Sequence, residues 1–303
     1  MLSGVSMKEE IKERAYAKVN IGLDVTGIRE DGYHLLDTVM HTIDLYDDVT
    51  VRRSSSGGIS VSANDPAIDT GEKNLMRRAA ELIMGEAGLD EGLEIVLDAR
   101  IPTRAGMGGG SADAAAVLRA VNGLFDLGYS VHRLRRMAVR LGADVPFQVT
   151  GGTARCTGIG EIIEELPDVT GGYIAVVKPR RGIDTPFVFK ELDREILPQS
   201  VHPNMAEVVA YIHAGEVRHM SEAMGNILER VTVREVPEVG EIKKLMMSSG
   251  ALGSLMTGSG TTVFGIFESR DRAEACVRKI TDAEICTVVG LSVQDSSAPG
   301  AQR

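Results

Sequence analysis

The chain has 303 residues, and 43% of them are hydrophobic, which is enough for a substantial core in one large domain or two ordinary ones. Its net charge of -10 argues against a nucleic-acid partner, because an acidic surface repels phosphate backbones. No apolar run approaches the roughly 20 residues of a membrane span, and the charged residues 1–14 are not expected to be a signal peptide. Three cysteines without a CxxC pair favour a reducing compartment, so we expect a cytoplasmic protein.

The N-terminal half mixes strands with helices. Alternating apolar residues predict a strand over 15–26, whereas 35–45 has a mixed period and is left unassigned. Two strands, 48–53 and 58–63, are expected to pair around the turn at 54–57. Apolar periodicity predicts further elements in chain order: helix 74–85, strand 93–99, a helix from Ser111, helix 131–141, and strand-like stretches with glycine turns over 146–165.

A segment with proline and glycine, LPDVTGG at 166–172, is the candidate domain boundary, giving domains 1–165 and 166–303. The elements expected after it are strand 173–177, helices 185–192, 205–214 and 239–248, strand 262–267 and helix 270–280. The polar tail from Ser296 is expected to be disordered. Strands and helices do not alternate strictly, so the sequence predicts an α+β fold.

The most informative segment is a glycine-rich loop, PTRAGMGGGSADAAA, at 102–116. Closely spaced glycines let backbone amides surround an anion, and Ser111 is a capable N-cap for the alanine-rich helix that follows. A helix N-terminus adds free N–H groups and partial positive charge. No lysine precedes Ser111 and no glycine stands at 111, which excludes a P-loop and a dinucleotide fingerprint. The bland alternative is a flexible turn, but the pattern favours phosphate binding.

This loop closely resembles the Pro-x-x-x-Gly-Leu-Gly-Gly-Gly-Ser-Ser loop of the galactokinase, homoserine kinase, mevalonate kinase and phosphomevalonate kinase (GHMP) superfamily. Met107 replaces the usual leucine, and Ala112 replaces the frequent second serine. The resemblance implies a two-domain kinase fold with the active site in the cleft between domains. The residues that it assigns to ATP binding are Asn74, Pro102, Thr103, Arg104, Ala105, Gly106, Met107, Gly108, Gly109, Gly110, Ser111 and Ala112. Asn74 is equally suited to be a helix N-cap.

Two N-terminal segments extend the resemblance. The first resembles the superfamily in general, and the second, together with residues 142–147, resembles its branch that phosphorylates 4-diphosphocytidyl-2-C-methyl-D-erythritol. AYAKVNIGLDV, from Ala15, is similar to the first strand of the family, with Lys18 and Asn20 in an Ala-Lys-x-Asn pattern. DGYHLLDTV places Tyr33 and His34 where the branch meets the cytosine end of its substrate. Stacking and hydrogen bonds to a base edge suit these residue types, although a core aromatic and a satisfied histidine are the plainer alternatives.

Three later segments continue the resemblance. LGADVPF carries the position of the catalytic aspartate of the family, here Asp144, and Pro146 is expected to keep Val145 extended. VKPRRGIDTPFVF resembles a substrate-side loop with Thr185 and Phe189 as contacts. LMTGSGTTVFG resembles the third motif of the superfamily, with Gly258 and Ser259 beside the substrate, and the NILE element at 226–229 is interpreted as structural.

The resemblance implies transfer of the ATP γ-phosphoryl group to a hydroxyl of the small-molecule substrate. Asp144 would act as general base and Lys18 would pair with Asp144 or the substrate oxygen, with Mg²⁺ held near Ser111. Alternatives are another kinase of the superfamily, for mevalonate, homoserine or a sugar, or a non-catalytic nucleotide-binding protein on the same scaffold. No nucleic-acid or membrane partner is expected, and the protein is expected to be a monomer or a homodimer.

Overall fold

The computed structural model describes residues 8–195 and 202–293, so the predicted disordered tail lies outside the described residues. These residues form two compact units that are interleaved along the chain. The first unit comprises residues 8–16, 46–103 and 109–150, and the second comprises 17–45, 104–108, 151–195 and 202–293. Strands β1 (Glu10–Ile28) and β2 (His34–Ser54) contribute to both units. The predicted domain boundary at 165/166 is a single point in the sequence, whereas each unit is built from several segments. This boundary stays a prediction.

The sheet of the first unit has the strand order β3, β4, β2, β1. β2 pairs antiparallel with β4 (Gly92–Asp98), whereas β3 (Ile59–Ala63) pairs parallel with β4. The prediction that 48–53 pairs directly with 58–63 is therefore wrong. β4 separates the two strands because Gly92 passes against the turn, where an added Cβ would lie 2.5 Å from Ser56 O. Only a glycine fits at this close approach.

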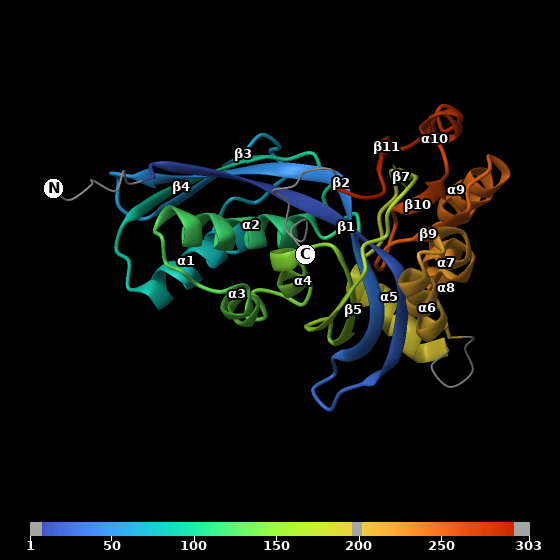
Figure 1. Cartoon of the computed structure of the whole chain (residues 1–303), viewed down its shortest axis with the longest axis horizontal. Coiled ribbons are helices and arrows are strands. Elements are labelled where there is room, and N and C mark those ends of the chain that lie inside the picture. The colour runs from blue at the N-terminus through green and yellow to red at the C-terminus, as the bar shows by residue number, and fades with distance from the viewer. Residues whose placement is uncertain (1–7, 196–201, 294–303) are drawn as a thin grey trace. The chain divides into compact units, whose positions relative to one another are not determined.

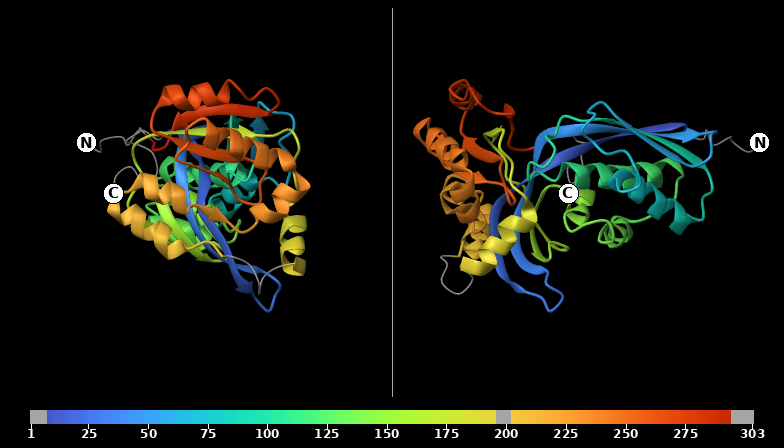
Figure 2. Two further views of the ribbon diagram at one scale, coloured as in Figure 1. Left: turned by 90° about the vertical axis from the view of Figure 1, so that its right-hand side faces the viewer. Right: turned by 180° about the vertical axis from the view of Figure 1, so that it is seen from behind.

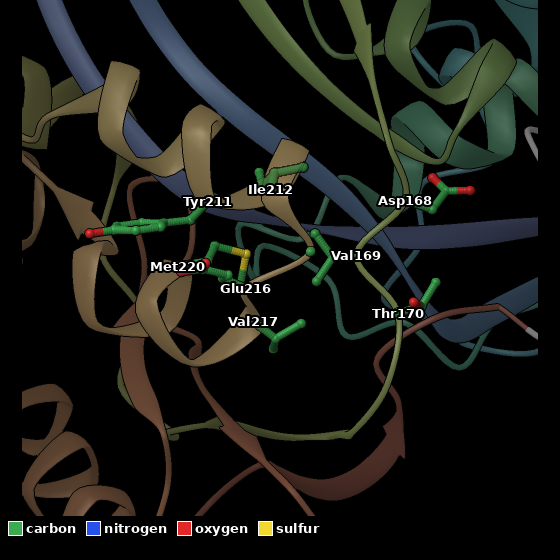
Figure 3. A pocket seen from close by; sticks show the side chains of 9 residues that line it. Asp168, Val169, Thr170, Tyr211, Ile212, Glu216, Val217 and Met220 are labelled. Carbon is green, nitrogen blue, oxygen red and sulfur yellow. The ribbon is translucent and has the colours of Figure 1, made fainter.

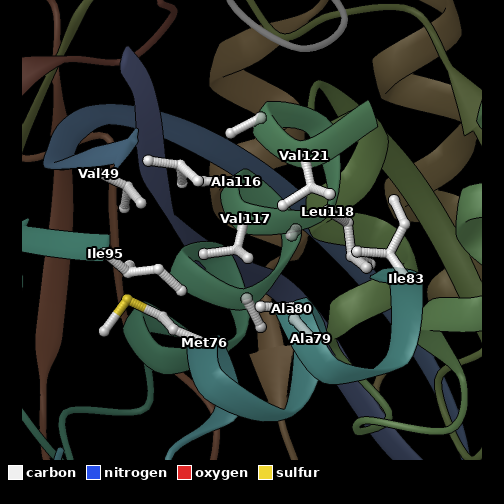
Figure 4. Close-up of a cluster of buried hydrophobic side chains, with 14 of the residues drawn as sticks. Val49, Met76, Ala79, Ala80, Ile83, Ile95, Ala116, Val117, Leu118 and Val121 are labelled. Carbon is white, nitrogen blue, oxygen red and sulfur yellow. The ribbon is translucent and has the colours of Figure 1, made fainter. Parts of the chain in front are cut away.

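Helices cover one face of this sheet (Figure 1). They are α1 (Leu75–Ala87), α2 (Gly109–Leu124), α3 (Val131–Ala138) and α4 (Val145–Thr150). Figure 4 shows how α1 and α2 pack their small and branched side chains against the sheet. The alanines of α2 let α1 approach closely, while Val117, Leu118 and Val121 fill the remaining space. The predicted helical stripe on the glycine-loop helix is confirmed for Val117, Leu118, Val121 and Leu124.

The second unit has two groups of strands. Its part of β2 pairs with β5 (Thr153–Gly158), which pairs with β6 (Ile162–Leu166), and its part of β1 pairs with the short β8 (Gly225–Asn226). A separate antiparallel sheet has the order β11, β7, β10, β9. Its strands are β7 (Tyr173–Lys178), β9 (Gly253–Met256), β10 (Val263–Phe267) and β11 (Ile285–Gly290).

Six helices lie among the described residues of the second unit (Figure 2). They are α5 (Thr185–Glu195), α6 (Met205–Ala214), α7 (Val217–Ala223), α8 (Glu229–Glu235), α9 (Pro237–Ser248) and α10 (Arg270–Val277). α9 and α10 cover the face of the four-stranded sheet that carries Val177 and Val263, forming one buried cluster. The mixture of antiparallel strands and helices in both units confirms the predicted α+β class. Among the described residues no helix combines the length and apolarity that a membrane crossing requires.

His41 joins several segments of the second unit. Its Nε2 lies 2.7 Å from Leu291 O and its Nδ1 lies 2.8 Å from Thr153 Oγ1. A carbonyl oxygen only accepts, so Nε2 carries the hydrogen and Nδ1 accepts from the threonine. The same hydroxyl accepts from Val169 N at 3.2 Å. Burial lowers the pKa of His41, so the neutral ring holds β2, β5 and the chain after β11 together.

Acid should weaken this junction. An unfolded histidine takes up a proton below about pH 6.5, whereas the lowered pKa of His41 resists protonation in the folded chain. The stability that His41 contributes is therefore complete above this pH and is lost as pH falls. We expect the unfolding temperature to drop between about pH 7 and pH 5, and to drop less in His41→Gln, which does not titrate. An equal drop in both proteins, measured by calorimetry, would contradict the assignment.

Candidate functional site

The glycine-rich loop combines a strained entry with an early helix. Arg104, Gly106 and Gly108 have positive φ angles of 54°, 71° and 71°, a left-handed backbone conformation that is typical of anion-binding turns. α2 begins at Gly109, so the prediction that Ser111 caps a helix starting at 111 is wrong. Gly109 and Gly110 are already helical, and Ser111 lies in the first turn. Its hydroxyl therefore stands beside the free N–H groups of the helix start.

This loop packs backbone to backbone against the turn of the third motif. A Cβ added at Gly106 would lie 2.5 Å from Thr257 O, and one added at Gly258 would lie 3.1 Å from Gly106 O. Gly258 also has a positive φ of 59°. Side chains at these two positions would drive the loops apart. The two glycine motifs, 151 residues or more apart in sequence, thus form one continuous surface in the second unit.

The turn at 256–259 is held from beneath by α8 and the residues that precede it. Asn226 Nδ2 donates to Met256 O and Gly258 O, at 2.8 Å each. Glu229 accepts from Met256 N at 2.9 Å, and Thr232 Oγ1 donates to Ser259 O at 3.0 Å. Buried backbone groups of the turn are thereby paired. The structural interpretation of the NILE element is confirmed, since its residues Asn226 and Glu229 make hydrogen bonds to the backbone of this turn.

Asn20 lies at the centre of a buried network that reaches both glycine motifs. Its Oδ1 accepts from Lys18 Nζ at 2.8 Å, from Gly258 N at 3.0 Å and from Thr257 Oγ1 at 3.1 Å. Lys18 and Asn20 are only 3% and 1% exposed. Lys18 N also donates to Met107 O in the glycine-rich loop at 3.0 Å. One amide oxygen therefore sets the position of the lysine relative to the third-motif turn.

The orientation of the Asn20 amide is fixed by Thr38. The Thr38 hydroxyl donates to Gly22 O at 2.6 Å, so its oxygen accepts from Asn20 Nδ2 at 2.8 Å. This arrangement turns Oδ1 toward Lys18 and the glycine turn. The predicted contact between Asn20 and substrate stays a prediction, and the structure adds a positioning role that the sequence did not indicate.

Asp144 directly precedes α4 and is half-buried. Its carbonyl accepts from Gln148 N at 3.2 Å, as the residue before a helix does. The expectation that Pro146 keeps Val145 extended is wrong, because Val145 begins α4 and Pro146 occupies its first turn, where a missing N–H has no cost. Asp144 belongs to the first unit and Lys18 to the second. Their pairing stays a prediction.

Two buried carboxyl groups, Asp47 and Asp113, lie at the base of the glycine-rich loop in the first unit. Asp47 accepts from Ile101 N at 2.7 Å and from Arg100 N at 2.5 Å, just before the loop. A hydrogen bond joins it to Asp113 in the second turn of α2, just after the loop. Burial and the neighbouring Asp47 raise the pKa of Asp113. Burial also raises the pKa of Asp47, but there the backbone N–H groups of Arg100 and Ile101 oppose the shift. Asp113 is therefore the member of the pair that carries the proton.

The predicted substrate-side residues fall into two groups. Thr185 Oγ1 lies 2.6 Å from Ser259 Oγ, which brings the predicted substrate loop to the third motif. His34 and Phe189 rings have centroids 4.5 Å apart. Tyr33 is 60% exposed and lies under the Arg29 guanidinium, 5.7 Å from its ring centroid, so it is no core aromatic. The structure thus pairs Thr185 with Ser259 and His34 with Phe189. Tyr33 lies on the surface.

Asn74 is the N-cap of α1, which was one of its two expected roles. Its Oδ1 accepts from Met76 N at 2.8 Å and its Nδ2 donates to Asp69 O at 2.6 Å. A separate small pocket in the second unit, between α6, α7 and residues 168–170, has a volume of about 40 Å³ (Figure 3). It contains no predicted site residue and holds little more than a water molecule. The glycine motifs therefore remain the candidate site.

Comparison with known proteins supports this location. The family model of the GHMP kinases N terminal domain matches residues 74–152, and that of the GHMP kinases C terminal matches residues 208–285. The 4-diphosphocytidyl-2-C-methyl-D-erythritol kinase of Clostridium tetani is 42% identical over 89% of this chain and 95% of its own length. This chain belongs to the 4-diphosphocytidyl-2-C-methyl-D-erythritol kinase family. The kinase of that name from Syntrophomonas wolfei is also 42% identical, over 88% of this chain and 93% of its own.

Solved structures agree with the family assignment. A crystal structure of 4-(cytidine 5'-diphospho)-2C-methyl-D-erythritol kinase matches with a TM-score of 0.75 and 33% identity, covering 92% of this chain and 99% of that chain. Leishmania major mevalonate kinase in complex with R-mevalonate has the same TM-score at 17% identity and covers 96% of this chain and 99% of its own. The second likeness concerns the fold alone. The recognition of the GHMP fold from the sequence is confirmed.

Three residues that support predicted site residues were missed by sequence reasoning. Thr38 and Asp113 lie inside quoted motifs, and Asp193, whose Oδ1 lies 2.7 Å from His34 Nε2, lies four residues beyond one. An isolated threonine or aspartate has many ordinary roles. Asp113 offered one usable signal, since it stands on the inward side of an alanine-rich helix where a charged group is costly. Thr38 offered none, because its importance depends on which atom of Asn20 faces it.

Removing the Asn20 amide should lower the turnover of the kinase more than the stability of its fold. Asn20→Ala leaves Lys18 Nζ and Gly258 N without their shared acceptor, and we expect turnover to fall about 10- to 100-fold. Steady-state kinetics with each purified variant measures this loss. Asn64→Ala is the matched control, since that exposed amide also bonds a side chain and a backbone N–H but lies in the other unit. Normal turnover in Asn20→Ala would contradict the positioning role.

Asp113→Asn should become more stable relative to wild type as pH rises. An acid whose folded pKa is raised releases its proton more readily when unfolded, so wild-type stability falls as pH increases above about 3.9. An amide donates to Asp47 at any pH. We expect similar unfolding temperatures near pH 5 and a higher one for Asp113→Asn near pH 8. Asp113→Leu, which removes the hydrogen bond between the two side chains and leaves Asp47 only its backbone donors, should lose about 1–3 kcal/mol at both values.

An unchanged difference in stability between wild type and Asp113→Asn across these pH values would show that Asp113 is ionised in the folded chain.

Proposed function

We propose that this chain transfers the γ-phosphoryl group of ATP to the 2-hydroxyl of 4-diphosphocytidyl-2-C-methyl-D-erythritol, in the methylerythritol phosphate route to isoprenoids. Relatives with this name are more than 40% identical over nearly their whole length. The structural observation that carries the proposal is the Asn20 network, which holds Lys18 against two glycine motifs. A buried, hydrogen-bonded ammonium beside amide-lined turns suits a reaction whose main demand is charge stabilisation.

The chain supplies positioning and proton transfer. The backbone amides of the loop at 102–112 and the start of α2 would bind the triphosphate of ATP. Asp144 would accept the proton of the acceptor hydroxyl late in the reaction, once bonding to phosphorus has acidified that hydroxyl. Lys18, oriented by Asn20, would stabilise the negative charge that develops on the oxygens.

Mg²⁺ is the proposed metal, with the Ser111 hydroxyl as its protein ligand. Mg²⁺ keeps several waters and binds through substrate phosphates and one or two protein oxygens. The described residues contain no preformed cluster of three acidic, histidine or cysteine ligands, and Asp113 is already engaged with Asp47. A hydroxyl at the start of α2 is thus the protein oxygen available beside the loop. When bound, the ion would neutralise charge on the phosphates of ATP.

The cytidyl end of the substrate is assigned to Tyr33, His34 and Phe189. The exposed Tyr33 ring offers a stacking face, and the paired rings of His34 and Phe189 supply a hydrogen-bonding edge and a second apolar face. Another GHMP kinase activity would leave this constellation without a role. We also propose that the protein is cytoplasmic and that it is a monomer or a homodimer.

The direct test follows ADP release with three acceptors in parallel: 4-diphosphocytidyl-2-C-methyl-D-erythritol, mevalonate and homoserine. We expect turnover only with the cytidyl compound. Turnover with another acceptor would keep the superfamily and overturn the cytosine assignment. ATP binding without turnover on any of them would favour a non-catalytic nucleotide-binding protein.

Asp144→Asn should lower kcat about 100- to 10,000-fold while the KM for ATP changes little, because the amide keeps the shape and loses the base. Asp90→Asn, at an exposed position of the first unit, is the control for loss of one charge. Near-normal turnover of Asp144→Asn would refute the general-base role.

A further inference from the structure

One face of α5 carries three polar or aromatic side chains at four-residue spacing: Thr185, Phe189 and Asp193. The first contacts Ser259 through its hydroxyl, at 2.6 Å. The second lies against the ring of His34, and the third places its Oδ1 2.7 Å from His34 Nε2. Figure 2 shows α5, in yellow, beside the blue strands that include His34. This face spans roughly 12 Å from the third motif to the histidine, at 1.5 Å per residue.

The His34 ring is therefore held at two points by the same helix. Phe189 packs against its plane, and the Asp193 carboxylate bonds one of its two nitrogens. The imidazole side chain is only 16% exposed, so this pair is partly shielded from water. A ring fixed both in plane and along one edge presents its other edge in a defined direction.

The Asp193 contact also decides which nitrogen carries the hydrogen. A carboxylate only accepts hydrogen bonds, so Nε2 must be the donor. In the neutral imidazole this leaves Nδ1 with a free lone pair, as an acceptor. Between residues 8–195 and 202–293 no hydrogen bond to His34 Nδ1 is present. The edge that faces away from Asp193 is thus an acceptor with a defined orientation.

We propose that Asp193 is the positioning residue that sets base specificity, by holding His34 with its hydrogen on Nε2 so that Nδ1 accepts from the exocyclic amine of cytosine. Cytosine carries an N–H donor where uracil carries a carbonyl oxygen. That oxygen would face the lone pair of Nδ1 and be repelled, so a uridyl substrate is rejected. This inference rests on the proposed function, which assigns the cytidyl group to this region.

Glu191, the other acidic residue of α5 whose side chain the structure describes, does not replace Asp193. Glu191 accepts from Arg194 at 2.5 Å and lies 3.6 Å from Arg234, on a different side of the helix. Its carboxylate is therefore occupied. Loss of Asp193 should leave His34 free to place its hydrogen on either nitrogen, because neither tautomer is then favoured by a partner.

The experiment compares kcat/KM for 4-diphosphocytidyl-2-C-methyl-D-erythritol and for its uridyl analogue near pH 8, where histidine is ordinarily neutral. We expect Asp193→Ala to reduce the preference for the cytidyl acceptor about tenfold, the equivalent of one hydrogen bond, with an unchanged KM for ATP. Asp193→Glu should restore part of the preference. Asp282→Ala removes an 84% exposed carboxylate from the same unit and should leave the preference unchanged.

Two outcomes would overturn the inference. An unchanged preference in an active Asp193→Ala, or an equal loss with both acceptors, would assign Asp193 a structural role only. The imidazole nitrogen chemical shifts of His34 in the unliganded wild-type protein give a test without turnover, and a hydrogen on Nδ1 there would contradict the proposal. Failure of the proposed function is distinguishable, since the wild-type protein itself would then not phosphorylate the cytidyl acceptor.

Discussion

The geometry of the candidate site depends on one amide oxygen, Oδ1 of Asn20. Asn20 is 1% exposed, and its Oδ1 accepts hydrogen bonds from Lys18 Nζ, Thr257 Oγ1 and the backbone N–H of Gly258. A buried acceptor with three donors resists displacement, because each donor would otherwise be left unpaired in a medium of low dielectric. Gly106 and Gly258 bring the two glycine turns beside this network into backbone contact, and a Cβ at either position would force them apart. Lys18 thereby acquires a position fixed by the core.

The support beneath this network is equally polar. Asn226, Glu229 and Thr232 pair the backbone of the third-motif turn from one side, while Asp47 and Asp113 close the base of the glycine-rich loop in the other unit. Loops that bind phosphate must expose backbone amides, and exposed amides cannot also stabilise their own loop. Buried side chains therefore do so, which explains why so many polar residues of this kinase are inaccessible to solvent.

The sequence singled out the motifs that the structure brings together, because they depend on residue type and spacing. Glycines before a helix, and a lysine two residues before an asparagine, can be recognised in the amino-acid sequence alone. The use of Asn20 was not visible, because an amide that binds substrate and one that binds protein have the same letter. Contacts between segments more than 200 residues apart, such as Asn20 with Thr257, lie beyond any local pattern.

The secondary-structure predictions likewise succeeded for local patterns and failed where tertiary packing decides the outcome. Long periodic helices were predicted within a few residues, but Gly109 and Val145 were placed outside helices that contain them. Glycine and the residue before proline carry weak local preferences, and tertiary packing overrode both. The paired strands around 54–57 failed for another reason, since a turn does not reveal that β4 passes between its two arms.

The interleaving of the two units also constrains how the chain is made. Neither unit is complete until distant segments have been synthesised: the first needs residues as far as 150, and the strands of the second over 17–45 await partners that begin at 151. Such an order raises the mean sequence separation of contacts and slows folding relative to a chain of successive domains. The nascent chain must therefore carry unpaired strand edges of β1 and β2 for most of its synthesis, a period in which chaperones are most useful.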